Sequence, residues 1–340
     1  MTPSSIAPLR VAAIPFASRP GDTRENVSRV VAWLDEAARA GITLAVFPEA
    51  CLSGANGALR ARRTSRAQWH ALAEPLDGAA IGAIAQAVER TGVAAGVGWI
   101  ERAADGRCFN SYVVCLPGGA RFCHRKLHTG AQQVGNGSRF TVFDTQWGVR
   151  VGILIGADNE VVENARVTAL MGATLLLAPH RSDPVAAARG VDRAGFGSID
   201  ALRRALPGRA LDNGTFIVLA AGEDDGASAG ARGAAMIVDP RGRVLADSLA
   251  GSSLRSSAGS ADFLPFVSAV IDRSLVDASV SGHWRAARRP ALYRPLTAAA
   301  PDDAQPPERA PQRAVARGAV PISFAVVRRS VKPTPSGDAS

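Results

Sequence analysis

The chain has 340 residues, of which 47% are hydrophobic and 20% are charged, and its formal net charge is +9. This balance is typical of a globular protein with a full-sized core, and no apolar run approaches the roughly 18–20 residues that a membrane-spanning helix needs. We therefore expect no membrane partner. The N-terminal segment does not have the charged-then-apolar layout of a signal peptide, which favours the cytoplasm.

The positive charge does not indicate a nucleic-acid partner. Residues 297–340 contain six basic and four acidic residues, which leaves a net +7 scattered over residues 1–296. Aromatic and basic side chains do not alternate, and no nucleic-acid motif is present. The four cysteines have neither a CxxC pair nor a Cys/His zinc spacing, so we expect free thiols, no metal and no cofactor.

Strands and helices alternate along the chain, as the spacing of apolar residues shows. Asp22 or Thr23 is positioned to cap the first helix, and Gly41 suits its end. In chain order we expect strands at residues 9–16, 43–48, 93–101, 108–116, 121–126, 140–145, 149–155, 174–178, 215–221, 233–239, 244–247 and 267–272, and helices at residues 24–40, 79–91, 160–171 and 199–206.

The order of these elements predicts an α/β protein in which helices pack on mixed sheets. The polar segments at residues 181–197 and 223–232 are predicted loops, and the first is typical of a lid or binding loop. From residue 297 onward the chain is rich in Pro, Ala and Arg, which indicates a disordered tail. We also favour disorder for the apolar run at residues 320–327. The alternatives are one strand or a segment docked on a partner chain.

Three short segments carry the candidate catalytic residues. FPEACLSG (residues 47–54) places Glu49 after an apolar strand, where a buried carboxylate can act as a general base. HRKLH (residues 124–128) contains Lys126, which is one of only two lysines in the chain, the other being Lys332. All other residues counted as Lys or Arg are arginines. The third segment, VRVGILIGADNEVVENAR (residues 149–166), is a strand, a small-residue elbow at Gly156 and an acidic helix start.

In this order and at these distances, the three segments resemble the nitrilase (carbon–nitrogen hydrolase) superfamily. The resemblance implies a four-layer α-β-β-α sandwich over residues 8–296, followed by the tail at residues 297–340. It also implies attack on non-peptide C–N bonds by a Glu–Lys–Cys set. Glu49 then stands at the position of the base, Lys126 at that of the cation for the oxyanion, and Gly156 at that of the nucleophile. Because glycine has no side chain, we expect the usual covalent thiol mechanism to be absent.

The resemblance assigns supporting positions as well. Ala157 follows the elbow, Asp158 and Glu163 match acidic positions that orient the elbow and helix, and His128 and His180 border the pocket. A second glutamate that many family members carry between the lysine and the cysteine is missing here, since only Asp144 lies in that interval.

Cys51 is the candidate for a displaced nucleophile. It stands two residues after Glu49, and in an extended segment the two side chains share a face. Packing in the core is the alternative, because a small buried cysteine usually behaves as an apolar side chain.

Two kinds of function stay open at this point. One is an enzyme that hydrolyses a small amide, nitrile or carbamoyl compound with water activated by Glu49. The other is a non-catalytic pseudoenzyme that binds a small amide, nitrile or carboxylate, or serves as an oligomer partner. The glycine is either natural or introduced into an ordinary hydrolase. A small molecule and a homodimer or higher homo-oligomer are the expected partners, since residues 288–296 resemble a terminal arm often found in dimer packing.

Overall fold

The computed structural model describes residues 8–54, 65–129, 134–181, 199–224, 233–248 and 266–298. The chain divides into a compact unit that ends at Arg288 and a second unit that begins at Arg289. In the second unit the described residues form the 3-10 helix η3 (Pro290–Leu296). Of the loops predicted at residues 181–197 and 223–232, the ends at residues 181 and 223–224 belong to strands. The rest of these loops, and the predicted tail from residue 299 onward, lie outside the described residues. The domain limits of 8–296 and 297–340 therefore stay predictions.

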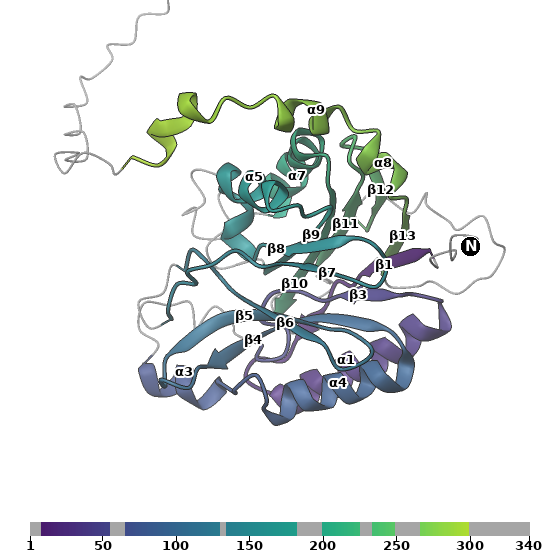
Figure 1. Cartoon of the computed structure of the whole chain (residues 1–340). Coiled ribbons are helices and arrows are strands. Elements are labelled where there is room, and N and C mark those ends of the chain that lie inside the picture. Colours follow the sequence, from purple (N-terminus) through teal and green to yellow (C-terminus); the bar gives the residue numbers. More distant parts are fainter. Residues whose placement is uncertain are drawn as a thin grey trace, which may run out of the picture. The chain divides into compact units, whose positions relative to one another are not determined.

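Within the first unit, the described strands form two mixed sheets (Figure 1). The first has the order β13-β1-β3-β4-β5-β6, made of β1 (Leu9–Ala13), β3 (Leu44–Val46), β4 (Ala94–Arg102), β5 (Cys108–Cys115), β6 (Arg121–Arg125) and β13 (Val267–Ile271). The second has the order β12-β11-β10-β9-β8-β7, made of β7 (Val142–Asp144), β8 (Arg150–Ile153), β9 (Leu175–Arg181), β10 (Phe216–Asp224), β11 (Ala234–Val238) and β12 (Val244–Asp247), with β2 (Ala17–Ser18) paired to β10.

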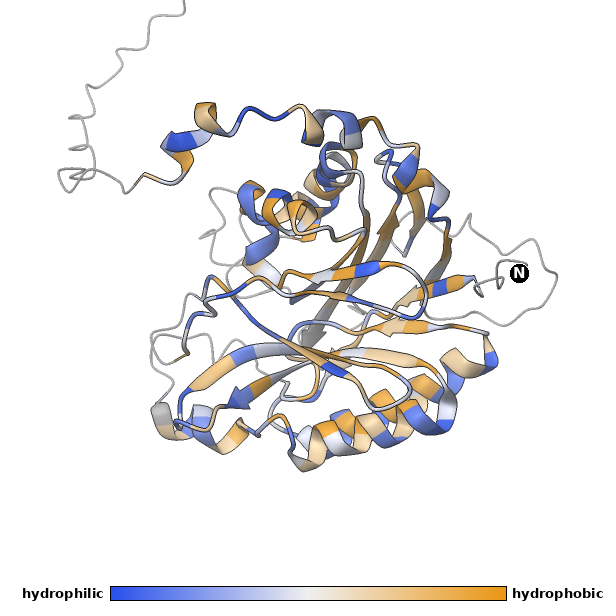
Figure 2. Ribbon diagram, viewed as in Figure 1, coloured by the Kyte–Doolittle hydropathy of each residue, from blue (hydrophilic) through white to orange (hydrophobic). Residues whose placement is uncertain are grey.

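Helices cover the outer face of each sheet. The described helices of this unit are α1 (Thr23–Arg39), α3 (Arg66–Leu72), α4 (Ala79–Thr91), η1 (Gly156–Asn159), α5 (Val162–Leu170), α7 (Ile199–Asn213), α8 (Ser274–Asp277) and α9 (Val280–Ala286). Both α1 and α4 mix hydrophilic and hydrophobic residues (Figure 2), and α1 buries its apolar stripe of Val30, Leu34 and Ala37. Asp22 caps α1 through a hydrogen bond from the Glu25 backbone N–H, as one of the two predicted caps.

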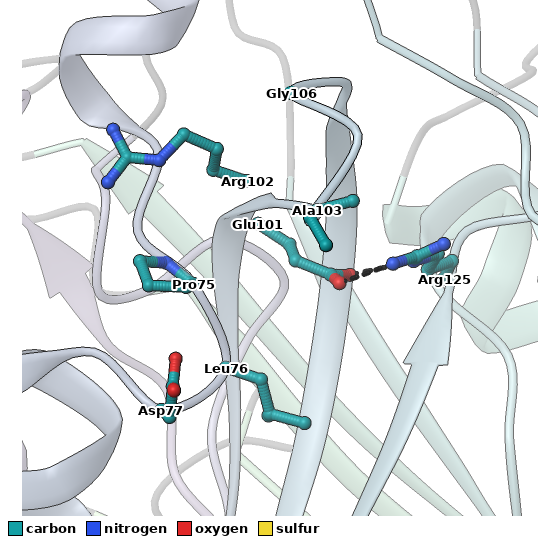
Figure 3. Close-up of a pocket in the computed structure, with 9 residues that line it drawn as sticks. Pro75, Leu76, Asp77, Glu101, Arg102, Ala103, Gly106 and Arg125 are labelled. Atoms are coloured by element: carbon teal, nitrogen blue, oxygen red, sulfur yellow. Dashed lines mark hydrogen bonds and ion pairs between the residues drawn. The ribbon is translucent and has the colours of Figure 1, made fainter.

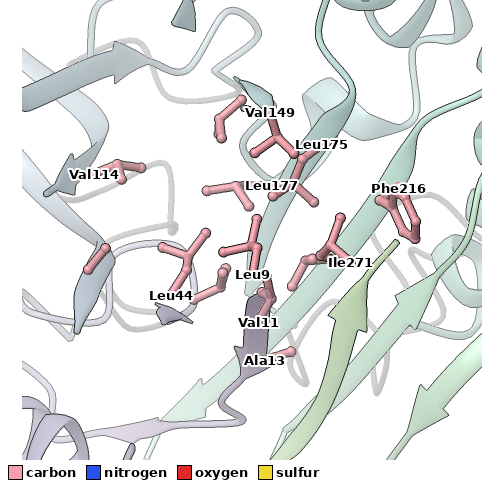
Figure 4. Packing of buried hydrophobic residues seen from close by; sticks show 14 of the residues in the cluster. Leu9, Val11, Ala13, Leu44, Val114, Val149, Leu175, Leu177, Phe216 and Ile271 are labelled. Carbon is pink, nitrogen blue, oxygen red and sulfur yellow. The ribbon is translucent and has the colours of Figure 1, made fainter. Parts of the chain in front are cut away.

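Three apolar clusters establish the layers. The first lies between the sheets and takes residues such as Leu44 and Leu177 from both (Figure 4). The second joins the first sheet to α1 and α4, and the third joins the second sheet to α7. The predicted four-layer α-β-β-α sandwich is confirmed, since the clusters alternate with the two sheets.

Three differences from the predicted elements lie at prolines. The strand expected at residues 9–16 ends at Ala13, because Pro15 has no N–H for the ladder, and pairing resumes only at β2. In contrast, β9 continues through Pro179. Its neighbour β8 pairs with it only as far as Leu177, so no partner on that side needs the N–H that proline lacks. Helix α7 continues through Pro207 to Asn213, and its buried residues Leu202, Leu206 and Ala210 keep one face packed across the proline.

Helices α3, α8 and α9 were not among the predicted elements. Each is seven residues or shorter, too short for an apolar period to show in the sequence. The helix expected at residues 160–171 begins at Val162, because the 3-10 turn η1 comes first. No described helix is long and apolar enough to cross a membrane.

Candidate active site

Glu49 lies in a tight turn at the end of β3. The turn is sterically demanding, because Ala50 has a φ of 51° and is the non-glycine residue with a left-handed backbone among those described. Such a conformation costs about 1–2 kcal/mol for a residue with a β-carbon. The turn packs against β4, where a β-carbon on Gly98 would lie 2.3 Å from the Ala50 nitrogen. The Glu49 side chain in this closely packed turn is buried and only 1% exposed.

Lys126 follows the last residue of β6 and pairs with Glu49. Its backbone N–H donates to the Asn110 carbonyl over 2.8 Å, which extends the ladder between β5 and β6 by one residue. Its Nζ donates to Oε1 of Glu49 over 2.7 Å. The lysine is 9% exposed, so the ion pair is buried and only weakly screened by solvent.

Gly156 begins η1 and lies directly beside this pair. Its φ of 55° is left-handed, which glycine adopts without strain. A β-carbon placed there would lie 2.4 Å from Oε2 of Glu49 and 2.5 Å from Nζ of Lys126. The structure thus brings the three predicted positions together, and the ends of the ion pair occupy the space that a side chain at position 156 would need.

Asp158 ties the elbow to the segment after Lys126. Its carboxylate accepts hydrogen bonds from the backbone N–H groups of Leu127 and His128 over 2.9 and 2.8 Å. Burial raises the pKa of Asp158, and these hydrogen bonds oppose that rise. Nδ1 of His128 lies 3.0 Å from the same carboxylate, while about half of the His128 side chain is exposed. Asp158 therefore fixes the geometry between the elbow and Lys126, in keeping with the orienting role expected for it.

The other predicted site residues lie around this centre. Ala157 is the second residue of η1, and Glu163 is exposed in the first turn of α5. Glu163 is therefore not part of the buried cluster. His180 is buried in β9, a strand that contacts η1. Asp144 is the last residue of β7; it is exposed and forms an ion pair with Arg150.

Two asparagines of the site were missed by the sequence interpretation. Asn110 in β5 donates from Nδ2 to Oε1 of Glu49 over 2.7 Å. Asn159 donates from Nδ2 to the carbonyls of Leu154 and Gly156 over 2.7 and 3.1 Å. The signal for Asn110 in the sequence is weak, since it is one of two adjacent polar residues, Asn110 and Ser111, in the strand CFNSYVVC.

The structure does not support the geometry on which Cys51 was chosen. The segment from Glu49 to Gly54 is a series of turns and not an extended strand, so the prediction of a shared face is wrong. The Cys51 thiol donates to the Gly98 carbonyl over 3.6 Å, and burial raises the pKa of the thiol to about 12. Cys51 packs in the apolar cluster beside α1 and α4, which favours the packing alternative.

A surface hollow lies at the ends of β4 and β6 that carry Glu101 and Arg125 (Figure 3). Glu101 and Arg125 line it, and the Arg125 guanidinium binds the Glu101 carboxylate with distances of 2.9 and 2.5 Å. Arg125 precedes Lys126, and neighbouring side chains along a strand point to opposite faces. The hollow is therefore separate from the Glu49–Lys126 pair. Among the described residues, no group of three or more His, Cys, Asp or Glu is arranged to hold a metal ion.

Comparisons with known proteins agree on one family. The family model described as carbon-nitrogen hydrolase matches residues 10–253. An (R)-stereoselective amidase from a Pseudomonas species is 35% identical over 247 residues, which cover 70% of this chain and 80% of that protein.

Two solved structures share the fold. One is Nit3 of Saccharomyces cerevisiae, a member of branch 10 of the nitrilase superfamily, with a TM-score of 0.62, 19% identity and coverage of 81% of this chain and 94% of that one. The other is a variant of the amidase from Nesterenkonia sp. AN1 that carries the acetamide moiety of fluoroacetamide at its active site cysteine. Its TM-score is 0.62 at 18% identity, with coverage of 86% of this chain and 98% of that one. Since the family model covers more than half of the sequence, the chain belongs to the carbon-nitrogen hydrolase family of the nitrilase superfamily.

Proposed function

We propose that this chain acts on a small amide-type molecule without a covalent thiol step. The observation that carries the proposal is the buried pair of Glu49 and Lys126, 2.7 Å apart, beside a glycine at position 156. In this proposal Glu49 is the general base that activates a water molecule. Lys126 stabilises the negative charge that develops on the carbonyl oxygen.

The residue at position 156 excludes the usual nucleophile. In the similar Nesterenkonia amidase, the acetamide moiety of fluoroacetamide is attached to the active site cysteine. Glycine has no atom that can form such a bond. Cys51 does not replace it in this proposal, because a thiol with a pKa of about 12 is almost entirely protonated at neutral pH.

The charges at the elbow favour an amide over a carboxylate. Oε2 of Glu49 accepts hydrogen bonds and Nζ of Lys126 donates them, and both border the same point beside Gly156. A primary amide offers a carbonyl oxygen to the lysine and an N–H to the glutamate. A carboxylate ligand would instead face the negative charge of Glu49.

A non-catalytic binding protein is the second candidate. One observation favours it specifically: the ends of the Glu49 and Lys126 side chains occupy the space beside Gly156. Two donors on Oε1 of Glu49 also stabilise the charged form, which weakens Glu49 as a base. This candidate predicts amide binding with no release of ammonia.

Comparing the unmodified chain with Gly156→Cys tests the proposal. We expect the unmodified chain to form no covalent adduct. Any ammonia that it releases from short amides should still be released after thiol alkylation. This release should be lost in Glu49→Gln. Gly156→Cys should release ammonia at least about a hundredfold faster, because the nucleophile accounts for a large share of catalysis in such sets. Ammonia assays and intact-protein mass spectrometry with fluoroacetamide give both readouts.

Gly156→Ala is the matched control for that experiment. It introduces the same left-handed strain and the same β-carbon, but no sulfur. Equal rates for Gly156→Cys and Gly156→Ala would show that the elbow no longer supports thiol chemistry. A thiol-linked adduct on the unmodified chain would overturn the proposal itself.

We also propose that the chain forms a homodimer through α9. The exposed apolar residues Trp284 and Val280 lie on one side of this helix, and Leu211 of α7 and Leu170 of α5 are exposed as well. The three helices are adjacent, since Ser281 donates to the Leu211 carbonyl and Arg285 to the Ala169 carbonyl. Exposed apolar side chains on adjacent helices favour an association site, which is the basis of this proposal.

Substituting Trp284 tests the dimer. We expect Trp284→Asp to weaken self-association at least about tenfold, because a buried aromatic side chain is a common energetic centre of an interface. Val244→Asp is the control, since Val244 is similarly exposed but belongs to β12. Sedimentation velocity over a concentration series measures both, and an equal effect of the two substitutions would contradict the proposal.

A further inference from the structure

The carboxylate of Glu49 is held by two donors from two strands. Nδ2 of Asn110 in β5 donates to Oε1 over 2.7 Å, and Nζ of Lys126 after β6 donates to the same oxygen over 2.7 Å. The other oxygen, Oε2, is the atom that lies beside Gly156. The two oxygens of Glu49 therefore have different surroundings, and only one borders the elbow.

The backbone fixes this arrangement. The Lys126 N–H donates to the Asn110 carbonyl over 2.8 Å, next to the paired residues Ser111 and Arg125. Residues directly opposite on neighbouring strands point to the same face of a sheet. Asn110 and Lys126 thus reach Glu49 from the same side because the register of β5 and β6 puts them there.

The chemistry of the amide also sets its orientation. An ionised carboxylate accepts hydrogen bonds and cannot donate, so Asn110 must present its NH₂ group to Glu49. Its Oδ1 is then buried and has no hydrogen-bond partner among the described residues. An unpaired buried acceptor lowers stability, so packing alone does not account for an asparagine here. The contact with Glu49 does account for it.

We infer that Asn110 is a positioning residue that fixes the carboxylate of Glu49 so that Oε2 faces the ligand at the elbow. The inference rests on the proposed function, in which Glu49 is the base. Without Asn110, Oε1 loses one of the donors that hold the carboxylate in this orientation. Its charged form also loses a hydrogen bond, so Glu49 takes up a proton at a higher pH.

The test follows the protonation of Glu49 directly, by ¹³C NMR of protein labelled at the glutamate carboxyl, with Glu49→Gln to assign the signal. In Asn110→Leu we expect the pH of half-protonation to rise by at least about one unit. Asn213→Leu is the matched control. Asn213 is also buried, donates from Nδ2 to the Arg209 carbonyl over 2.8 Å and has an unpartnered Oδ1, but it lies in α7. It should leave the Glu49 signal unchanged.

Ammonia-release kinetics give a second readout. The Asn110 substitutions are made in the unmodified chain or in Gly156→Cys, depending on which of the two releases ammonia. Removing Asn110 should lower kcat about 10–100-fold and change KM by less than about threefold, because a misplaced base impairs the chemical step. Asn110→Ser is the second variant, since it adds no volume to the site and is too short to reach Glu49.

A rise in the half-protonation pH with no ammonia release supports the inference and rejects the proposed hydrolysis. An unchanged Glu49 signal in a folded Asn110 variant, or an equal change in Asn213→Leu, overturns the inference.

Discussion

Replacing Lys126 with methionine should lower the free energy of unfolding by about 3–5 kcal/mol. Glu49 is 1% exposed, and in the variant its negative charge would be left in the interior without the ammonium 2.7 Å away. Removing one partner of a buried ion pair is costly because the remaining charge is desolvated and uncompensated. Urea unfolding followed by circular dichroism measures the change.

The exposed pair of Arg90 and Asp35 provides the control. Its side chains are 54% and 38% exposed, so Arg90→Met should cost only about 0–1 kcal/mol, although it also removes one cation from an ion pair. The double variant Glu49→Leu/Lys126→Met should recover much of the loss, because it leaves no unpaired charge. Equal losses for Lys126→Met and Arg90→Met would show that the Glu49–Lys126 pair is not buried as described.

Stability should also depend on pH through His124. This histidine of β6 is 1% exposed, and its Nδ1 lies 3.1 Å from the Thr141 hydroxyl. That hydroxyl donates to the Cys123 carbonyl, so Nδ1 carries the proton and Nε2 faces the interior, with no partner among the described residues. Protonation would place a buried charge at Nε2, which is why burial lowers the pKa of His124 from 6.5 to about 4.

The sign of the effect follows from that shift. Between pH 6.5 and 4 the unfolded chain binds a proton at His124 and the folded chain does not, so stability falls as the pH is lowered. The loss from this one group is absent above pH 6.5 and reaches about 3 kcal/mol below pH 4. We expect unfolding curves of the unmodified chain to show this additional loss relative to His124→Gln, which does not titrate.

His283→Gln is the control for His124. His283 lies in α9 and is exposed, so its substitution should leave the pH dependence of unfolding nearly unchanged. If His124→Gln lost as much stability between pH 6.5 and 4 as the unmodified chain, His124 would not be the group responsible.

The sequence allowed the main features of the fold to be predicted because they depend on local patterns. The alternation of strands and helices, the cap at Asp22 and the three motif segments are all visible within short windows. Glu49, Lys126 and Gly156 were found in this way, and the structure brings them together.

The missed features depend on contacts between distant segments. Asn110 is significant only because the register of β5 and β6 places it opposite Lys126, and register cannot be deduced from one strand alone. The error at Cys51 has a similar origin. The segment at Ala50 packs closely on Gly98 and has a left-handed backbone, so it turns where an extended segment was predicted.

The hydrogen bonds around the elbow do not involve a side chain at its apex. The hydrogen bonds that Asp158 and Asn159 make there end on the backbone of Leu127, His128, Leu154 and Gly156, and none requires a side chain at position 156. These hydrogen bonds therefore do not depend on position 156, but the left-handed backbone there and the adjacent ends of Glu49 and Lys126 favour glycine. Placing a sulfur atom in this bend would thus require two adjustments at once, a strained backbone at position 156 and a shift of the ends of the Glu49 and Lys126 side chains.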